Sequence, residues 1–132
     1  MRQKKRCLTD CDALLTEVVI GAAIEVHRAL GPGLLEAVYE EALFLELNQR
    51  GLGVARQVEI PVSYKGEELG VGFRADLIVN KSLLLELKSV SALTDIHLAQ
   101  VITYLRFLGF KRGLLLNFNV PLLKQGIKRV AI

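Results

Sequence analysis

The chain has 132 residues, close to the size of one common globular domain and long enough to bury a core. Its net charge of +3 permits an anionic partner, but it is not the strong basic excess of dedicated nucleic-acid binders. Hydrophobic residues make up 52% of the chain, yet the longest apolar run, residues 18–24, is far shorter than the roughly 20 residues that span a bilayer. Composition therefore excludes a membrane-spanning helix.

Residues 1–8 are predicted to form a flexible basic tail, favoured over an arm that grips DNA, of a single domain that spans residues 1–132. No apolar segment with a small-residue cleavage site follows the tail, so we expect no signal peptide. Cys7 and Cys11 are the only cysteines, and together with His27 and His97 they lack the spacing of a structural zinc site. We therefore expect free thiols and a cytoplasmic location.

A first helix is expected to begin at Thr9 or Asp10 and to end at Gly31-Pro32, because glycine closes a helix and proline cannot extend it. Apolar residues cover most of its circumference, which predicts a largely buried helix. The mean hydropathy of the chain, +0.37, is high for a soluble protein of this size. We therefore predict a homodimer or a surface that a partner covers.

A second helix is predicted from Leu35 to Arg50, where Gly51 closes it. Glu36 lies in its first turn, a position where the helix dipole alone favours an acid by about 0.3–1 kcal/mol. Spacing by itself therefore assigns no function to Glu36. Tyr39, three residues later, shares a face with Glu36 and is expected to point toward whatever Glu36 contacts.

Residues 54–64 alternate between apolar and polar side chains, which predicts a half-covered strand with an edge or a bulge at Pro61. Lys65-Gly66-Glu67 is predicted to be a hairpin turn, and residues 69–73 a return strand. Two further strands, residues 77–79 and 83–85, are continuous apolar runs joined by a turn at Asn80-Lys81-Ser82.

Three charged residues interrupt this last hairpin: Asp76, Glu86 and Lys88. Glu86 and Lys88 share one face of a strand, and the hairpin brings Asp76 alongside. Two carboxylates about 4 Å apart repel by roughly 4 kcal/mol at an effective dielectric constant of about 20. A cation is therefore expected there, either the Lys88 ammonium or a divalent metal such as Mg²⁺ or Mn²⁺. The residues alone also leave open an ordinary salt-bridged hairpin.

A third helix is predicted from Thr94 to Leu108, where Gly109 ends it. Gln100 and Tyr104 share a polar stripe on this otherwise apolar helix, and the stripe must face water, a ligand or the sheet edge. Residues 112–118 and 127–132 are predicted to be the last two strands. The order of elements predicts an α/β fold with a mixed central sheet flanked by helices.

Three motifs in this order resemble those of one enzyme superfamily. Asp76, nine intervening residues and Glu86-Leu87-Lys88 resemble the core motif of the PD-(D/E)xK nucleases, with Ala75 where the motif's name has proline. The segment from Gly33 through Glu36 to Tyr39 resembles the signature of the small bacterial GxxExxY family of that superfamily. Gln100 and Tyr104 are similar to the Gln-x-x-x-Tyr element of its exonuclease-like branch. The resemblance runs from about Leu14 to the C-terminus.

The resemblance implies a restriction-endonuclease-like core and a metal-dependent nuclease acting on nucleic acid, with DNA favoured over RNA. The implied catalytic residues are Glu36, Asp76, Glu86, Lys88, Gln100 and Tyr104. The implied ligands of Mg²⁺ or Mn²⁺ are Glu36, Asp76, Glu86 and the Leu87 carbonyl. A non-catalytic nucleic-acid-binding or protein-interaction module on the same fold and a small-molecule phosphohydrolase remain as alternatives. The intact set of Asp76, Glu86 and Lys88 favours the enzyme.

Overall fold

A computed structural model describes the backbone of residues 2–132 and the side chains of residues 12–132. Its elements are α1 (Arg2–Leu30), α2 (Glu36–Gln49), β1 (Val54–Tyr64), β2 (Glu67–Val79), β3 (Leu83–Lys88), α3 (Asp95–Leu108), β4 (Arg112–Asn117), the short 3-10 helix η1 (Leu123–Gly126) and β5 (Ile127–Ala131). α1 begins earlier than expected. The side chains of Cys7 and Cys11 lie outside the described residues, and the flexible tail over residues 1–8 stays a prediction.

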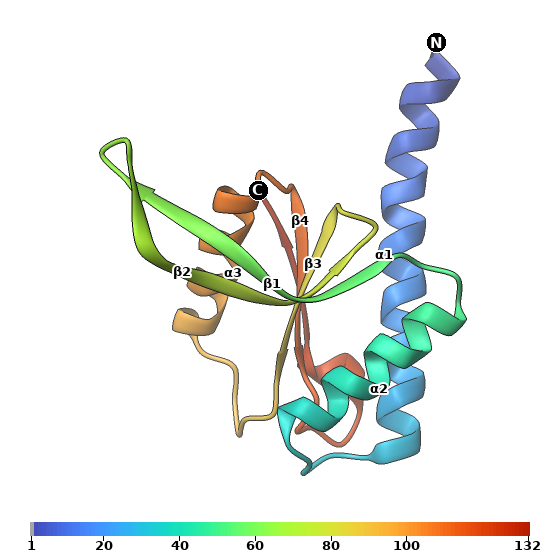
Figure 1. Ribbon diagram of the computed structural model, residues 1–132. Coiled ribbons are helices and arrows are strands. Elements are labelled where there is room, and N and C mark those ends of the chain that lie inside the picture. The colour runs from blue at the N-terminus through green and yellow to red at the C-terminus, as the bar shows by residue number, and fades with distance from the viewer. Residues whose placement is uncertain (1) are drawn as a thin grey trace.

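The five strands form one mixed sheet in the order β1-β2-β3-β4-β5. Only β3 and β4 are parallel, and α3 provides the crossover between them. α1 and α2 lie on one side of the sheet and α3 lies on the other (Figure 1). The predicted α/β fold with a mixed central sheet is confirmed. In the described part of the chain, no helix is long and apolar enough to cross a membrane.

Two hydrophobic cores hold these layers together, one on each face of the sheet. Leu83, Leu85 and Leu87 of β3 pack toward α1 and α2, whereas Leu84 packs toward α3. This division follows from the two-residue period of a strand, and it explains why β3 is apolar without interruption up to Glu86. α1 buries a stripe on one side and leaves Leu14 63% exposed, so it is less buried than its composition predicted.

β1 and β2 form a long hairpin that projects beyond the rest of the sheet (Figure 1). β2 is one continuous strand, so the expected return strand at residues 69–73 and the apolar run at 77–79 are parts of one element. The pairing shifts register between Pro61 and Ser63, where proline predicted an edge or a bulge. Asp76 lies near the C-terminal end of β2, next to the residues that pair with β3.

Candidate active site

β2 and β3 separate at Asp76 and Glu86, and the two carboxylates fill the opening. The backbone ladder between these strands covers only the pairs from Leu77–Leu85 to Val79–Leu83. Beyond it, the Asp76 N–H donates to Glu86 Oε2 at 2.8 Å, and the Leu87 N–H donates to Asp76 Oδ2 at 2.8 Å. Side-chain oxygens thus replace the next backbone acceptors, which fixes both carboxylates side by side, as the sequence predicted.

The other oxygen of each carboxylate is free for a ligand. Asp76 Oδ1 and Glu86 Oε1 accept no hydrogen bond from a described residue. Yet the described part of the chain contains no buried side-chain oxygen without a partner, so solvent reaches both atoms. Two adjacent, accessible carboxylate oxygens are the hard donors that Mg²⁺ and Mn²⁺ prefer.

The electrostatics of the pair disfavour two negative charges. Burial, followed by repulsion from Asp76, raises the pKa of the Glu86 carboxyl to about 8. Burial also raises the pKa of Asp76, although the hydrogen bond from the Leu87 N–H opposes this effect. Lys88 lowers both pKa values by its positive charge, but none of the ion pairs found among the described residues includes Lys88. The pair is therefore poised to gain from an added cation.

α3 lies on the face of the sheet opposite α1 and α2 (Figure 1), and it brings Tyr104 close to Asp76 and Glu86. Tyr104 is 7% exposed and stacks on Phe73 with a centroid distance of 4.8 Å. Burial and the charges of Glu86 and Asp76 raise the pKa of its hydroxyl. Gln100 is exposed one turn earlier on α3, with no hydrogen bond to another described residue. The His97 ring, one turn before Gln100, completes the capping box with Thr94.

Glu36 lies at the exposed N-terminus of α2, and the residues around it explain the surrounding motif. Tyr39 is fully buried; its hydroxyl donates to the Gly31 carbonyl at 2.6 Å and accepts from the Leu34 N–H at 3.1 Å. The Tyr39 ring stacks on Phe118 at 4.5 Å. Tyr39 therefore fixes the turn that precedes Glu36, and the expectation that it points toward the same group as Glu36 is wrong.

Two residues at the site escaped the sequence analysis: Glu40 and Gln57. Glu40 is 9% exposed, and the negative charge of its carboxylate, like that of Glu36, raises the pKa of Asp76. Gln57 Nε2 donates to Glu40 Oε1 at 2.6 Å, and Arg56 Nη2 donates to Glu40 Oε2 at 3.1 Å. One turn of spacing from Glu36 was the only sequence signal for Glu40, and none marked Gln57.

The loop after Lys88 is fixed by Asn117, which is 2% exposed. Its side chain accepts from the Val90 N–H at 3.1 Å and donates to the Val90 carbonyl at 3.0 Å. The Phe118 N–H donates to the Lys88 carbonyl at 2.9 Å. These bonds hold the end of β3 against β4 and restrict the backbone from which Lys88 extends.

The chain matches the PD-(D/E)XK nuclease superfamily over residues 13–130. The chain belongs to this superfamily. No curated protein matches the sequence significantly. No solved structure does so either. PD-(D/E)XK nucleases generally use divalent metals, and the donors at the opening between β2 and β3 fit such an ion.

Glu36, the third carboxylate that was predicted to bind the metal, does not complete a metal centre with Asp76 and Glu86 in this structure. Among the described side chains, no group of three or more His, Cys, Asp or Glu lies close enough to hold one ion. Glu36 contributes to the charge around Asp76 and Glu86, but it remains exposed on α2. Its role as a ligand stays a prediction.

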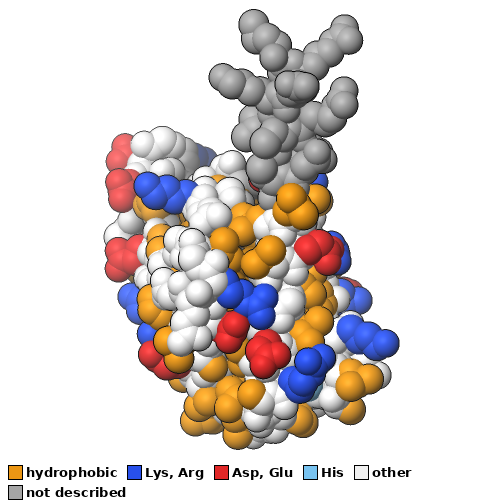
Figure 2. Space-filling view, turned by 90° about the vertical axis from the view of Figure 1, so that its right-hand side faces the viewer, with side chains coloured by type: hydrophobic (Ala, Val, Ile, Leu, Met, Phe, Trp, Pro, Cys, Tyr) orange, Lys and Arg blue, Asp and Glu red, His pale blue; other side chains and the backbone are white. Residues whose placement is uncertain are grey.

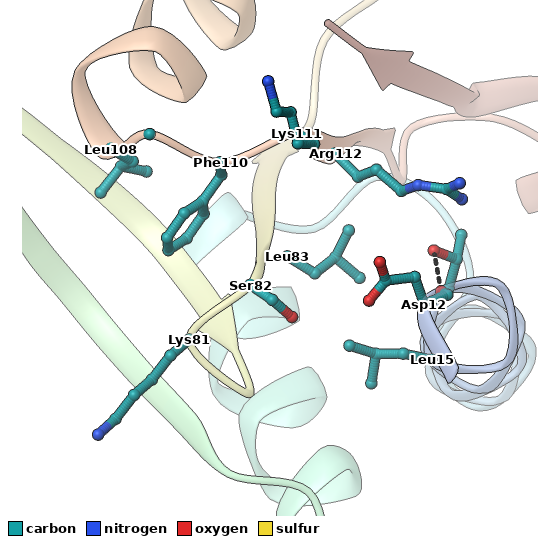
Figure 3. A pocket seen from close by; sticks show the side chains of 11 residues that line it. Asp12, Leu15, Lys81, Ser82, Leu83, Leu108, Phe110, Lys111 and Arg112 are labelled. Carbon is teal, nitrogen blue, oxygen red and sulfur yellow. Dashed lines mark hydrogen bonds between the residues drawn. The ribbon is translucent and has the colours of Figure 1, made fainter. Parts of the chain in front are cut away.

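A cavity of about 320 Å³ lies at the opposite end of β3 from the carboxylates, where Leu83 and Arg112 begin β3 and β4. It is bounded by α1 and by the segment after α3, and Lys81 and Lys111 point away from its centre (Figure 3). It contains none of the predicted site residues. The candidate site is therefore the opening between β2 and β3 and not this cavity.

Proposed function

We propose that this protein is a metal-dependent nuclease that hydrolyses phosphodiester bonds in nucleic acid, with DNA favoured over RNA. The observation that carries the proposal is the pair of carboxylates, Asp76 and Glu86, that replaces the strand ladder where β2 and β3 separate, with Lys88 two residues beyond Glu86. Membership of the PD-(D/E)XK superfamily supports the same chemistry. We also propose that the chain is of the GxxExxY type, because Tyr39 holds the turn before Glu36.

Mg²⁺ or Mn²⁺ would be held by Asp76 and Glu86, with Glu36 and the Leu87 carbonyl as the further predicted ligands. When bound, such an ion polarises a phosphate and lowers the pKa of a coordinated water. Its positive charge would also relieve the repulsion that raises the pKa of Glu86.

Lys88 has the role of a compact cation beside the scissile phosphate. Its ammonium would donate hydrogen bonds to the phosphate oxygens and stabilise the charge that develops there. Tyr104 lies near both carboxylates and Gln100 is one turn away, so these two would orient the nucleic-acid strand or the Lys88 ammonium. The bonds of Asn117 to Val90 and of Phe118 to Lys88 restrict the motion of this part of the site.

The mutational test replaces each of Asp76, Glu86 and Lys88 by alanine and compares cleavage of labelled DNA with that of the wild type. Each substitution is expected to abolish cleavage without unfolding the protein. Lys65→Ala, in the turn at the tip of the β1–β2 hairpin, is the matched control for loss of a lysine and is expected to retain activity. Retained activity in any of the three alanine variants would remove that residue from the mechanism.

The homodimer and the cytoplasmic location also remain proposals. The exposed large apolar side chains include Leu35 at 76%, Leu45 at 58% and Val38 at 42%, all on α2 or at its start. Figure 2 views the side of the molecule formed by α1 and α2, where patches of hydrophobic side chains alternate with charged ones. Such patches support a surface that a second copy or another protein covers.

A further inference from the structure

Beside the site, the hairpin of β1 and β2 turns over, meaning that each strand exchanges the faces that it presents to the two hydrophobic cores. Val54 packs against the core under α2, whereas Val58 packs against the core under α3, although the two residues have the same parity along β1. On β2, Leu77 and Ala75 divide between the two cores in the same way. In a regular strand residues two apart share one face, so both strands change face at a common point.

That point is the pair formed by Gln57 and Asp76. The register of the hairpin pairs Arg56 with Leu77 and Val58 with Ala75, which places Gln57 opposite Asp76. Gln57 has a φ of +49°, in the left-handed region that residues other than glycine rarely adopt. The hairpin therefore turns over at the left-handed Gln57, and the residue opposite it is Asp76, one of the two carboxylates of the candidate site.

The side chain of Gln57 is held while its backbone is in this conformation. Its amide donates to Glu40 Oε1 at 2.6 Å, and the neighbouring Arg56 donates to Glu40 Oε2 at 3.1 Å. Arg56 also donates to Glu41 and lies over the Phe44 ring, so α2 holds β1 at Gln57 and at the residue before it. These contacts hold Gln57 and Arg56 against α2 at the residue where β1 is left-handed.

We propose that Gln57, locked by Glu40, is a positioning residue that sets the place of the Asp76 carboxylate. An irregular residue in a strand re-aims the side chains around it, and irregularities of this kind concentrate next to active sites. Asp76 is then presented to the Leu87 N–H and to the side chain of Glu86, at the opening between β2 and β3. The consequence for catalysis rests on the proposed nuclease function, but the positioning itself does not.

The test compares Gln57→Gly with Lys65→Gly. Both residues are left-handed, with φ of +49° and +51°, so glycine relieves the same backbone strain in each; Lys65 lies in the turn at the tip of the hairpin, which makes it the matched control. Hydrogen exchange of the Leu87 amide, measured by NMR, reports whether Asp76 stays in place, because that amide donates to Asp76 Oδ2. Melting temperatures show whether each variant is folded.

We expect Gln57→Gly to fold and to lose about tenfold or more of the protection of the Leu87 amide, since a hydrogen bond to a charged group is released. Lys65→Gly should leave that protection unchanged. Glu40→Ala should lose protection as Gln57→Gly does, whereas Glu40→Gln, which keeps an acceptor oxygen for Gln57, should retain most of it. Unchanged protection in Gln57→Gly, or an equal loss in Lys65→Gly, would overturn the proposal.

Cleavage assays on the same variants separate this inference from the proposed function. Gln57→Gly should cleave nucleic acid about tenfold or more slowly than Lys65→Gly, because a small displacement of a catalytic group is costly. If the wild type cleaves nothing while the exchange results hold, the nuclease proposal fails and the positioning stands. If the wild type cleaves and Gln57→Gly cleaves equally well, Gln57 has no role in catalysis.

Discussion

Replacing Glu86 by glutamine is expected to stabilise the metal-free protein at alkaline pH while abolishing its proposed activity. Glu86 is 5% exposed and lies beside Asp76, so its charged form is disfavoured twice, by burial and by repulsion. Glutamine keeps an oxygen that accepts the Asp76 N–H, now bonded at 2.8 Å, and adds an amide that can donate to the Asp76 carboxylate. The substitution therefore exchanges a repulsion for a hydrogen bond.

The size and sign of the effect follow from the pKa of Glu86. The unfolded chain releases this proton near the ordinary pKa of 4.5, whereas the folded protein retains it until about pH 8. The folded state thus binds more protons between these two pH values, and its free energy of unfolding falls as the pH rises through this window. This difference in pKa, from 4.5 to about 8, corresponds to a contribution of at most about 5 kcal/mol to the free energy of unfolding. The contribution is fully lost above pH 8.

The assay is urea unfolding with chelator at pH 5 and pH 8.5. We expect the wild type and Glu86→Gln to differ little at pH 5 and the variant to be more stable by a few kcal/mol at pH 8.5. Glu59→Gln is the control, because the Glu59 side chain is 84% exposed and its pair with Arg74 is 3.8 Å long. Added Mg²⁺ should stabilise the wild type at pH 8.5 and not Glu86→Gln. An equal pH dependence of the wild type and Glu86→Gln would refute the electrostatic reasoning.

Four further predictions concern other parts of the fold and the site. Tyr39→Phe removes a hydroxyl with two hydrogen bonds from a fully buried side chain and should lower the free energy of unfolding by about 1–3 kcal/mol in denaturant titration. Asn117→Ala, which releases Val90, should destabilise the protein by a similar amount in the same titration. Glu36→Gln should leave stability within about 0.5 kcal/mol, because Glu36 is exposed, but should weaken Mg²⁺ binding by about 10–100-fold in calorimetry. Light scattering at micromolar concentration should give the mass of a dimer, and a monomeric mass would contradict the predicted homodimer.

The sequence was sufficient for most of the elements, though not for the start of α1 or the continuity of β2, and for the central carboxylate pair. Apolar runs, alternation and Gly or Pro boundaries placed α2, α3 and the last two strands within a residue or two, because these signals are local. The pair of Asp76 and Glu86 could be predicted because a tight turn at Asn80 fixes which residues of β2 and β3 meet.

The contributions of Glu40 and Gln57 could not be predicted, because they depend on contacts between distant segments. A glutamine in a strand pattern gives no sign of a left-handed backbone or of a hydrogen bond to Glu40 on α2. The regular alternation of Val54 and Val58 indicated one covered face, whereas the hairpin turns over between them. The role of Tyr39 was likewise misjudged, since helical spacing indicates a shared face but not the turn to which its hydroxyl bonds.

The most direct test of the central claim is cleavage of labelled single-stranded and duplex DNA and RNA by the wild type and by Lys88→Ala, each with Mg²⁺, Mn²⁺ or chelator. We predict that the wild type cuts DNA only when a divalent metal is present and that Lys88→Ala does not cut it. Failure of the wild type to cut any of these substrates, although calorimetry shows that it binds the metal, would contradict the account and would favour a binding module on the same fold.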